Sequence, residues 1–214
     1  MTQLLDGLVA AGRSDLAAAA DLPIPGPLPD RVAWLSGRSD ARHSALSPSQ
    51  ERLLGVAARR GFEPVLAGFP FVPGPEWSRA GLWRASLRNG RQYLALRRDP
   101  ATAESVAARL RPLFEGTTGR LLLICGSLGL ELLLAGLRGD RPPGRAAVRV
   151  VALGPVASDL PDDLDVWVAQ GRLDAISWLG YRGPVRSRPW CGHLGYAVRR
   201  DSAELVDAAC RSRW

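Results

Sequence analysis

The sequence predicts an α/β fold in which a mostly parallel central sheet has helices on both faces, preceded by a helical N-terminal segment. From residue 62 onward, short apolar runs alternate with stretches whose apolar residues recur at helical spacing. This alternation is typical of βαβ units, whose strands are parallel. The clearest strand is the uninterrupted apolar run 121–124, which indicates burial on both faces of a sheet.

Composition supports a globular protein with a sizeable core. The chain has 214 residues, of which 46% are hydrophobic and 23% charged. No apolar run is long enough to span a membrane, and the N-terminus lacks the basic start and cleavage pattern of a signal peptide. We therefore expect a cytoplasmic protein without a membrane span.

Charge and metal-binding residue types exclude several classes of function. All 28 basic residues are arginines, and the net charge is +7. The arginines are scattered singly or in pairs without interleaved aromatics, which argues against a nucleic-acid partner. Three cysteines in a reducing compartment argue against a disulfide framework, and two histidines provide no zinc-ligand spacing. We expect no metal and no cofactor.

The first sixty residues are predicted to be helical and connective. Residues 4–20 are alanine-rich with apolar residues at helical spacing, and the proline-rich stretch 22–31 interrupts them. A second helix is expected from Pro48 to about residue 60, because Ser47 and Gln50 form a capping-box pattern. We divide the chain into an N-terminal extension, 1–60, packed on a core domain, 61–214.

The core domain is predicted as a succession of strands and helices. Residues 62–71 indicate a strand that ends in a Gly-Phe-Pro loop. Residues 75–87 repeat apolar residues at helical spacing, and Asn89-Gly90 then indicates the end of that helix. The remaining expected elements are strands at 93–96, 121–124, 147–153, 165–170 and 185–189, and helices at 102–114, 130–137 and 202–211.

Residues 120–137 contain a turn of small residues between a strand and a helix, with Ser127 at its apex. This segment resembles the nucleophile elbow of the α/β-hydrolase family, whose pattern is G-x-S-x-G. Gly126, Ser127, Leu128 and Gly129 match the pattern, and Cys125 stands at its first glycine. The resemblance covers about residues 62–214.

The resemblance also implies the partners of Ser127. In that family an acid and then a histidine follow the nucleophile in chain order, each past the end of a strand. Gly171-Arg172-Leu173-Asp174 and Gly192-His193 occupy those places. The loop 67–70, Ala-Gly-Phe-Pro, resembles the H-G-F-P loop that helps to form an oxyanion hole. The implied donors are the backbone N–H groups of Phe69 and Leu128.

The implied activity is that of a serine hydrolase acting on an ester or thioester through a covalent acyl-enzyme. Ser127 would be the nucleophile, His193 the base and Asp174 the acid. Only residues 154–163 join two predicted strands where relatives insert a lid, so we expect a compact enzyme with an open site that suits a bulky or carrier-bound acyl group. Possible substrate contacts are Trp178, Trp190 and Tyr196.

Several alternatives remain at this point. Asp159, after the preceding strand, is a rival acid, and Asp174 is also placed to cap a helix that begins at Ala175. The departures at Cys125 and Ala67 favour a non-catalytic relative that binds a ligand or partner. A third hypothesis, a phosphate-binding domain at residues 126–129, lacks the further glycines and the lysine of nucleotide-binding loops.

Overall fold

The computed structural model describes residues 2–17, 24, 26–40, 44–69, 81–139, 146–158 and 160–214. In chain order the elements are α1 (Thr2–Ala17), β1 (Leu28–Ser36), α2 (Pro48–Ala58), β2 (Glu63–Phe69), α3 (Leu82–Arg98), α4 (Pro100–Glu115), β3 (Thr117–Gly126), α5 (Gly129–Gly139), β4 (Ala147–Leu153), β5 (Asp165–Ala169), α6 (Ala175–Gly180), the short 3₁₀ helix η1 (Tyr196–Val198) and α7 (Arg200–Arg211).

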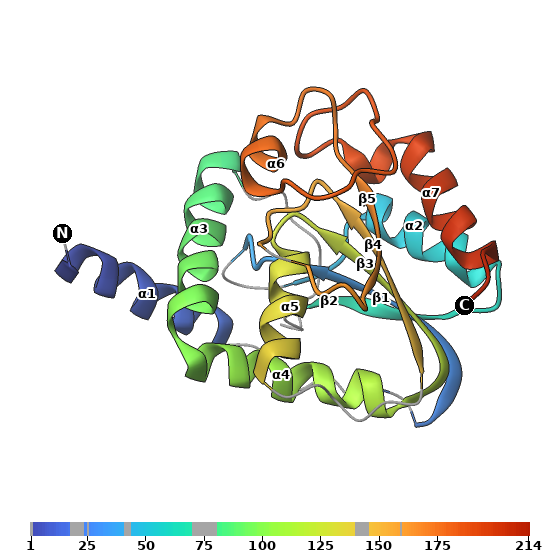
Figure 1. The fold of residues 1–214 in the computed structure, drawn as a ribbon, viewed down its shortest axis with the longest axis horizontal. Coiled ribbons are helices and arrows are strands. Elements are labelled where there is room, and N and C mark those ends of the chain that lie inside the picture. Colours follow the sequence, from blue (N-terminus) through green and yellow to red (C-terminus); the bar gives the residue numbers. More distant parts are fainter. Residues whose placement is uncertain are drawn as a thin grey trace.

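The five strands form one parallel sheet in the order β2-β1-β3-β4-β5. Helices cover both faces of this sheet, with α3, α4 and α5 on one side and α2 and α7 on the other (Figure 1). The predicted fold class is therefore confirmed: a mostly parallel α/β sheet with a helical N-terminal segment.

The central strand β3 shows why this sequence requires two covering layers. Leu121, Leu123 and Cys125 belong to the hydrophobic cluster under α4 and α5, whereas Leu122 and Ile124 belong to the cluster under α2 and α7. All five side chains are fully buried. A strand with apolar residues on both sides gains this burial only between two helical layers.

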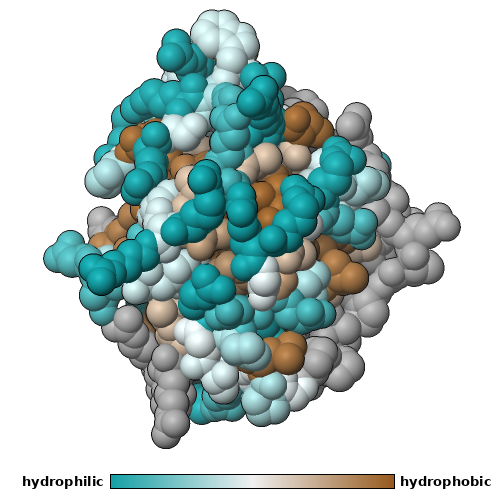
Figure 2. Space-filling view, turned by 90° about the vertical axis from the view of Figure 1, so that its right-hand side faces the viewer, coloured by the Kyte–Doolittle hydropathy of each residue, from teal (hydrophilic) through white to brown (hydrophobic). Residues whose placement is uncertain are grey.

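Helix α7 covers one face with a strongly amphipathic surface. Leu205, Val206 and Ala209 point into the sheet, while Glu204 and Arg211 are exposed. Figure 2 turns this side of the molecule to the viewer and shows hydrophilic side chains projecting from the surface, with separate hydrophobic patches visible between them. None of the helices in the described ranges combines the length and apolar composition needed to cross a membrane.

The N-terminal sixty residues contain a strand that we did not predict. The structure confirms α2 with its capping box, in which Ser47 N–H donates to Gln50 Oε1 at 2.7 Å. However, β1 lies inside the sheet between β2 and β3, so the proposed division between 1–60 and 61–214 does not coincide with the sheet. Residues 32–35 are completely or almost completely buried. We did not predict a strand there because this apolar run is short and follows a proline-rich stretch.

The second correction concerns α3. We predicted a helix that ends at Asn89-Gly90 and a strand at 93–96. Both predictions are wrong, because residues 82–98 form a single helix. Residues 75–80 of the predicted helix lie outside the described ranges. Gln92, Ala95 and Leu96 are buried at helical spacing. Gln92 is held by two 2.9 Å hydrogen bonds with the backbone of Arg38, which fixes this helix against the end of β1.

The expected last strand at 185–189 is also absent from the sheet. Ser187 makes an isolated parallel bridge to Ala169, and the N–H groups of Arg186 and Ser187 both donate to the Val168 carbonyl. Pro184 and Pro189 flank this segment, and a proline has no N–H with which to continue a ladder. The segment instead leads the chain back toward the end of β3.

Candidate active site

Ser127 lies in a sharp turn between β3 and α5. It is the one non-glycine residue with a positive φ in the described ranges, at +51°. Its N–H donates to the Leu153 carbonyl at 3.1 Å, and its carbonyl accepts from Val156 N–H at 3.0 Å. Both bonds tie the strained turn to the end of β4. A left-handed backbone at a serine costs free energy and is typical of functional turns.

The two glycines of the turn are required by close approaches of backbone and ring atoms. A Cβ at Gly129 would lie 2.1 Å from the Leu35 carbonyl oxygen, and one at Gly126 would lie 2.8 Å from the Trp34 ring. By contrast, Cys125 fits at the first position of the motif, where it is fully buried in β3. Burial raises the pKa of the Cys125 thiol far above its usual value, so this residue is a packing group.

Replacing Gly129 by alanine should lower the free energy of unfolding by about 3 kcal/mol, because neither the Leu35 backbone nor α5 can move away from the new Cβ. Chemical denaturation measures this change. Gly55→Ala in α2 is the matched control, since its Cβ would meet only Arg59 Nη1 at 3.9 Å. The control should raise stability by about 0.5–1 kcal/mol. Equal effects of the two substitutions would contradict the steric argument.

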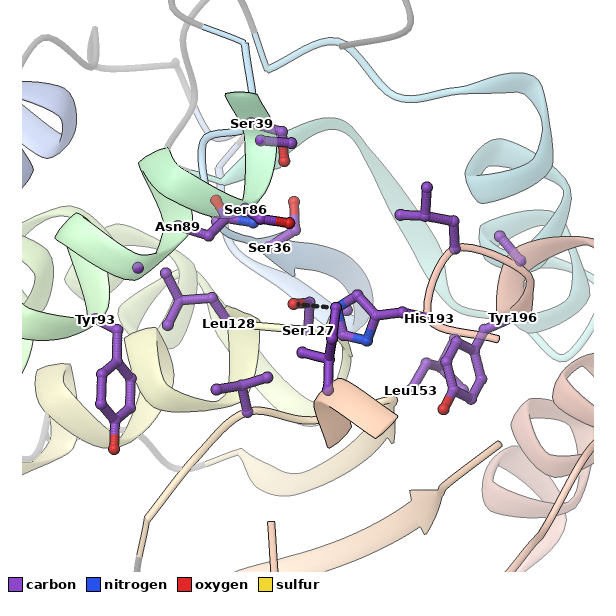
Figure 3. A pocket seen from close by; sticks show the side chains of 18 of the residues that line it. Ser36, Ser39, Ser86, Asn89, Tyr93, Ser127, Leu128, Leu153, His193 and Tyr196 are labelled. Atoms are coloured by element: carbon purple, nitrogen blue, oxygen red, sulfur yellow. Dashed lines mark hydrogen bonds between the residues drawn. The ribbon is translucent and has the colours of Figure 1, made fainter. Parts of the chain in front are cut away.

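The structure brings Ser127, His193 and Asp174 together in one hydrogen-bonded chain. His193 Nε2 lies 2.8 Å from Ser127 Oγ, a contact that Figure 3 draws as a dashed line. His193 Nδ1 lies 2.9 and 3.0 Å from the two carboxylate oxygens of Asp174. A carboxylate can only accept, so Nδ1 carries the proton and Nε2 accepts the serine hydroxyl proton.

Asp174 has two roles, because it is also the N-cap of α6. Its Oδ1 accepts from the Ser177 N–H at 3.0 Å, and its Oδ2 accepts from the Tyr196 hydroxyl at 2.5 Å. Burial acts to raise the pKa of this carboxyl, but the hydrogen bonds from His193, Tyr196 and Ser177 outweigh it, and the pKa lies below its ordinary value. Asp174 is thus ionised at neutral pH. The rival acid, Asp159, lies outside the described residues.

Tyr196 supports Asp174 from behind. Its hydroxyl donates to Asp174 Oδ2 and accepts from the Gly171 N–H at 2.6 Å, and the side chain is buried. We predicted Tyr196 as a substrate contact; its ring does line the pocket beside Ser127. The other two predicted contacts lie elsewhere: Trp178 Nε1 donates to the Gly171 carbonyl, and the exposed Trp190 ring lies against the Arg172 guanidinium. Neither is part of the pocket lining.

Tyr196→Phe should lower the free energy of unfolding by about 1–3 kcal/mol, because it leaves the Gly171 N–H without its buried partner and removes a donor from Asp174. Denaturant titration measures the change. Tyr93→Phe is the matched control: Tyr93 also lines the pocket, but its hydroxyl has no hydrogen-bond partner among the described residues. A loss of the same size in both variants would show that the Tyr196 network contributes nothing specific.

Of the two residues predicted to donate to the oxyanion, one lines the pocket and the other does not. Leu128 directly follows Ser127 and lines the pocket. Phe69 does not line the pocket, because it lies on β2. It is in register with Leu35 of β1, and Leu35 pairs with Cys125 of β3. Two strand spacings of about 4.8 Å each therefore separate Phe69 from β3. The unpredicted strand β1 takes the place next to β3, and its end brings Gly37 to the pocket.

A pocket of about 450 Å³ opens above Ser127 and His193. Its described lining contains no aspartate, glutamate or arginine, although the chain has 28 arginines. One wall is apolar, and the wall formed by α3 and the end of β1 is polar. The lining residues are Trp34, Ser36, Gly37, Ser39, Gln50, Ala85, Ser86, Asn89, Gly90, Tyr93, Gly126, Ser127, Leu128, Leu153, Val156, Ile176, His193, Leu194, Tyr196 and Ala197.

The arrangement is suited to activating a hydroxyl group. A serine hydroxyl becomes a nucleophile when an adjacent imidazole accepts its proton, and a carboxylate behind the ring stabilises the charged form. The described ranges contain no group of three or more histidine, cysteine or acidic side chains placed to hold a metal ion.

Comparison with known proteins identifies relatives in fold. No protein-family model and no curated protein sequence matches the chain. Among solved structures, esterase PE8 is similar over 88% of this chain and 95% of its own, with a TM-score of 0.53 and 15% identity. An uncharacterised protein from Bacillus cereus is similar over 92% of this chain and 65% of its own, with a TM-score of 0.51 and 13% identity. At these identities the likeness concerns the fold, and it is consistent with an α/β-hydrolase-like architecture.

Proposed function

We propose that this protein is a serine hydrolase that cleaves a carboxylic ester or thioester through a covalent acyl-enzyme. The observation that carries the proposal is the chain of hydrogen bonds from Ser127 through His193 to Asp174, at the carboxyl end of a parallel sheet. The fold shared with esterase PE8 supports it. Each of the three residues follows a strand or lies in a loop that leads from one, where open α/β sheets place their sites.

The reaction would begin with attack of Ser127 Oγ on the substrate carbonyl carbon, while the hydroxyl proton passes to His193 Nε2. The tetrahedral intermediate then collapses: the bond to the leaving alcohol or thiol breaks, and His193 returns the proton to that leaving group. A water molecule repeats the sequence on the acyl-enzyme, with His193 accepting its proton. The acid is released and Ser127 regains its hydrogen.

Two backbone groups would stabilise the oxyanion. We assign Leu128 N–H, at the start of α5, and Gly37 N–H, at the end of β1, since both residues line the pocket beside Ser127. The neighbouring Arg38 N–H already donates to Gln92 Oε1 at 2.9 Å. Gly37 thus replaces Phe69 in the role that the sequence suggested. Such a donor contributes about 3 kcal/mol to transition-state stabilisation.

The short connection between β4 and β5 supports a bulky or carrier-bound acyl substrate. Only residues 154–164 join β4 to β5, so no lid domain is inserted between these strands. A carrier-bound thioester and a free ester remain the two substrate forms to compare.

Labelling with a fluorophosphonate tests the proposal directly. The native protein should gain one adduct by intact mass, and peptide mapping should place it on Ser127. Protein unfolded in denaturant before labelling is the control, because the activated hydroxyl requires the folded triad. Turnover of an ester and a thioester with the same acyl group then ranks the two substrate classes. A folded protein that accepts no label would favour the non-catalytic, ligand-binding alternative.

A further inference from the structure

Helix α3 forms one wall of the pocket with a single face. Five of its residues line the pocket: Ala85, Ser86, Asn89, Gly90 and Tyr93. Residues one, four, five and eight positions apart in a helix lie on the same side, so these five form one face. Four of these side chains are small or polar, and none is aliphatic beyond alanine. This face therefore lines the pocket, and of its five residues Tyr93 also packs against the hydrophobic core.

Asn89 and Gly90 have low helix propensity, which makes them unfavourable in the middle of a helix. Glycine is the least favourable helix residue apart from proline, and asparagine is also disfavoured. Apart from the backbone of α3 itself and the two chain neighbours of Gly90, no atom of the described residues lies within 4 Å of the position that a Cβ at Gly90 would take, so steric crowding from those residues does not require glycine there. The absent side chain instead leaves space in the pocket. Residues that break a local rule without a structural benefit are expected at functional sites.

The Asn89 side chain contains a buried acceptor without a partner. Its Oδ1 is shielded from solvent and has no hydrogen-bond partner among the described residues. A Cβ built on Gly37 would lie 2.5 Å from this oxygen and 3.1 Å from Leu128 Cδ2, so the amide lies close to both proposed oxyanion residues. A buried unpaired polar atom destabilises a fold, so its presence beside the pocket calls for a functional explanation.

Three serines accompany Asn89. Ser36 and Ser39 come from the end of β1, and Ser86 comes from the preceding turn of α3; Figure 3 shows all three on the Asn89 side of the pocket. Their hydroxyls have no hydrogen-bond partner within the described residues. We call these four residues the polar wall. The lining also contains five aliphatic residues from other segments: Leu153, Val156, Ile176, Leu194 and Ala197.

We propose that the polar wall is a subsite for an uncharged hydroxyl-bearing group of the substrate, with Asn89 as its specificity-determining residue. This inference rests on the proposed hydrolase function, and it defines the substrate class as a neutral ester with a hydroxylated part and an aliphatic part. Neutral amide and hydroxyl groups suit a neutral ligand, and a charged ligand would lack a counter-ion in the described lining. The hydroxyl belongs either to the acid or to the alcohol, and the test separates these two sources.

Two pairs of esters distinguish the sources. For the acid side, 4-nitrophenyl 3-hydroxybutyrate is compared with 4-nitrophenyl butyrate. For the alcohol side, glycerol monobutyrate is compared with propyl butyrate. The wild type should prefer the hydroxylated member of one pair. Asn89→Leu should lower that preference, measured as the ratio of kcat/KM values, by about five- to tenfold, which corresponds to one neutral hydrogen bond.

Two further variants separate recognition from structural damage. Ser86→Ala removes a second member of the polar wall and should lower the same ratio by a smaller factor. Ser105→Ala, on α4 and away from the pocket lining, is the matched control and should leave the ratio unchanged. A variant that merely loosened the fold would slow both esters of a pair alike. An unchanged ratio in Asn89→Leu and Ser86→Ala would overturn the inference.

Binding separates the failure of this inference from the failure of the proposed function. In a Ser127→Ala background, calorimetry with two neutral pairs, glycerol monobutyrate against propyl butyrate and methyl 3-hydroxybutyrate against methyl butyrate, reports on the subsite without turnover. Selective binding of the hydroxylated partner that Asn89→Leu abolishes would support the subsite even if no ester were cleaved. If the well-folded variant binds no hydroxylated compound in preference to its partner, the inference is wrong, whatever the labelling of Ser127 shows.

Discussion

Ser127→Ala should abolish fluorophosphonate labelling and reduce kcat for ester hydrolysis by roughly 10⁴- to 10⁶-fold. The substitution removes the atom that would form the acyl bond, while His193 and Asp174 keep their mutual contacts. Residual turnover should not show an acyl-enzyme burst. The measurement is steady-state and pre-steady-state hydrolysis of a 4-nitrophenyl ester by wild type and variant.

The fold should survive this change. Alanine occupies the +51° φ of position 127 no more comfortably than serine does, and the backbone bonds to Leu153 and Val156 are retained. We therefore expect a free energy of unfolding within about 1 kcal/mol of the wild type. Ser105→Ala controls for the loss of a hydroxyl elsewhere. A Ser127→Ala protein with more than a few per cent of wild-type activity would exclude Ser127 as the nucleophile.

Asp174→Asn should lower kcat by about 10⁴-fold without unfolding the protein. The amide can still cap α6 through its oxygen, but it cannot stabilise a charged imidazole as a carboxylate does. It also favours the wrong tautomer, because an amide nitrogen facing Nδ1 is a donor. Asp174→Ala should lose the same activity and in addition about 1 kcal/mol of stability, since the N-cap is lost as well. The comparison separates the two roles of this residue.

The pH dependence of stability provides a second measurement on Asp174. Its pKa is lower in the folded protein than its ordinary value, so the folded state binds fewer protons than the unfolded state in that range. The stabilisation is fully present above the ordinary carboxyl pKa of about 3.9 and is lost as pH falls through the lowered folded value. The difference in unfolding free energy between wild type and Asp174→Asn should shrink over that acidic interval. A difference independent of pH would contradict the assignment.

Much of the candidate site could be predicted from sequence because its parts are local. Ser127 and Asp174 each lie in a short turn after an apolar strand, and parallel strands carry such turns to one edge of the sheet, whereas His193 lies in a loop after residues 185–189, which make only an isolated bridge. The strand 147–153 and the helix over 102–114 also agree with the structure, because their periodicity is unambiguous. What joins these turns in space is the register of β3 with its neighbours.

The parts that could not be predicted depend on tertiary contacts. The strand β1 has a short apolar core and gains its stability from pairing with β3, a partner far away in sequence. The resemblance of residues 67–70 to an H-G-F-P loop placed Phe69 beside Ser127, whereas the structure lines the pocket with the end of β1. In α3, Asn89-Gly90 has the composition of a helix end, yet the helix continues because Gln92 is held by Arg38 and Leu96 is buried. Tertiary packing overrode the local signal there.

The strand order has a consequence for how the chain acquires its structure. Asp30 of β1 contacts Arg120 of β3 across 90 residues, and every neighbouring pair of strands in the sheet is parallel. Such non-local pairing closes large loops before it gains contacts, so folding should be slow for a chain of this length. Until β3 is available, β1 would expose apolar side chains and unpaired backbone groups. Refolding yield should therefore fall steeply as protein concentration rises.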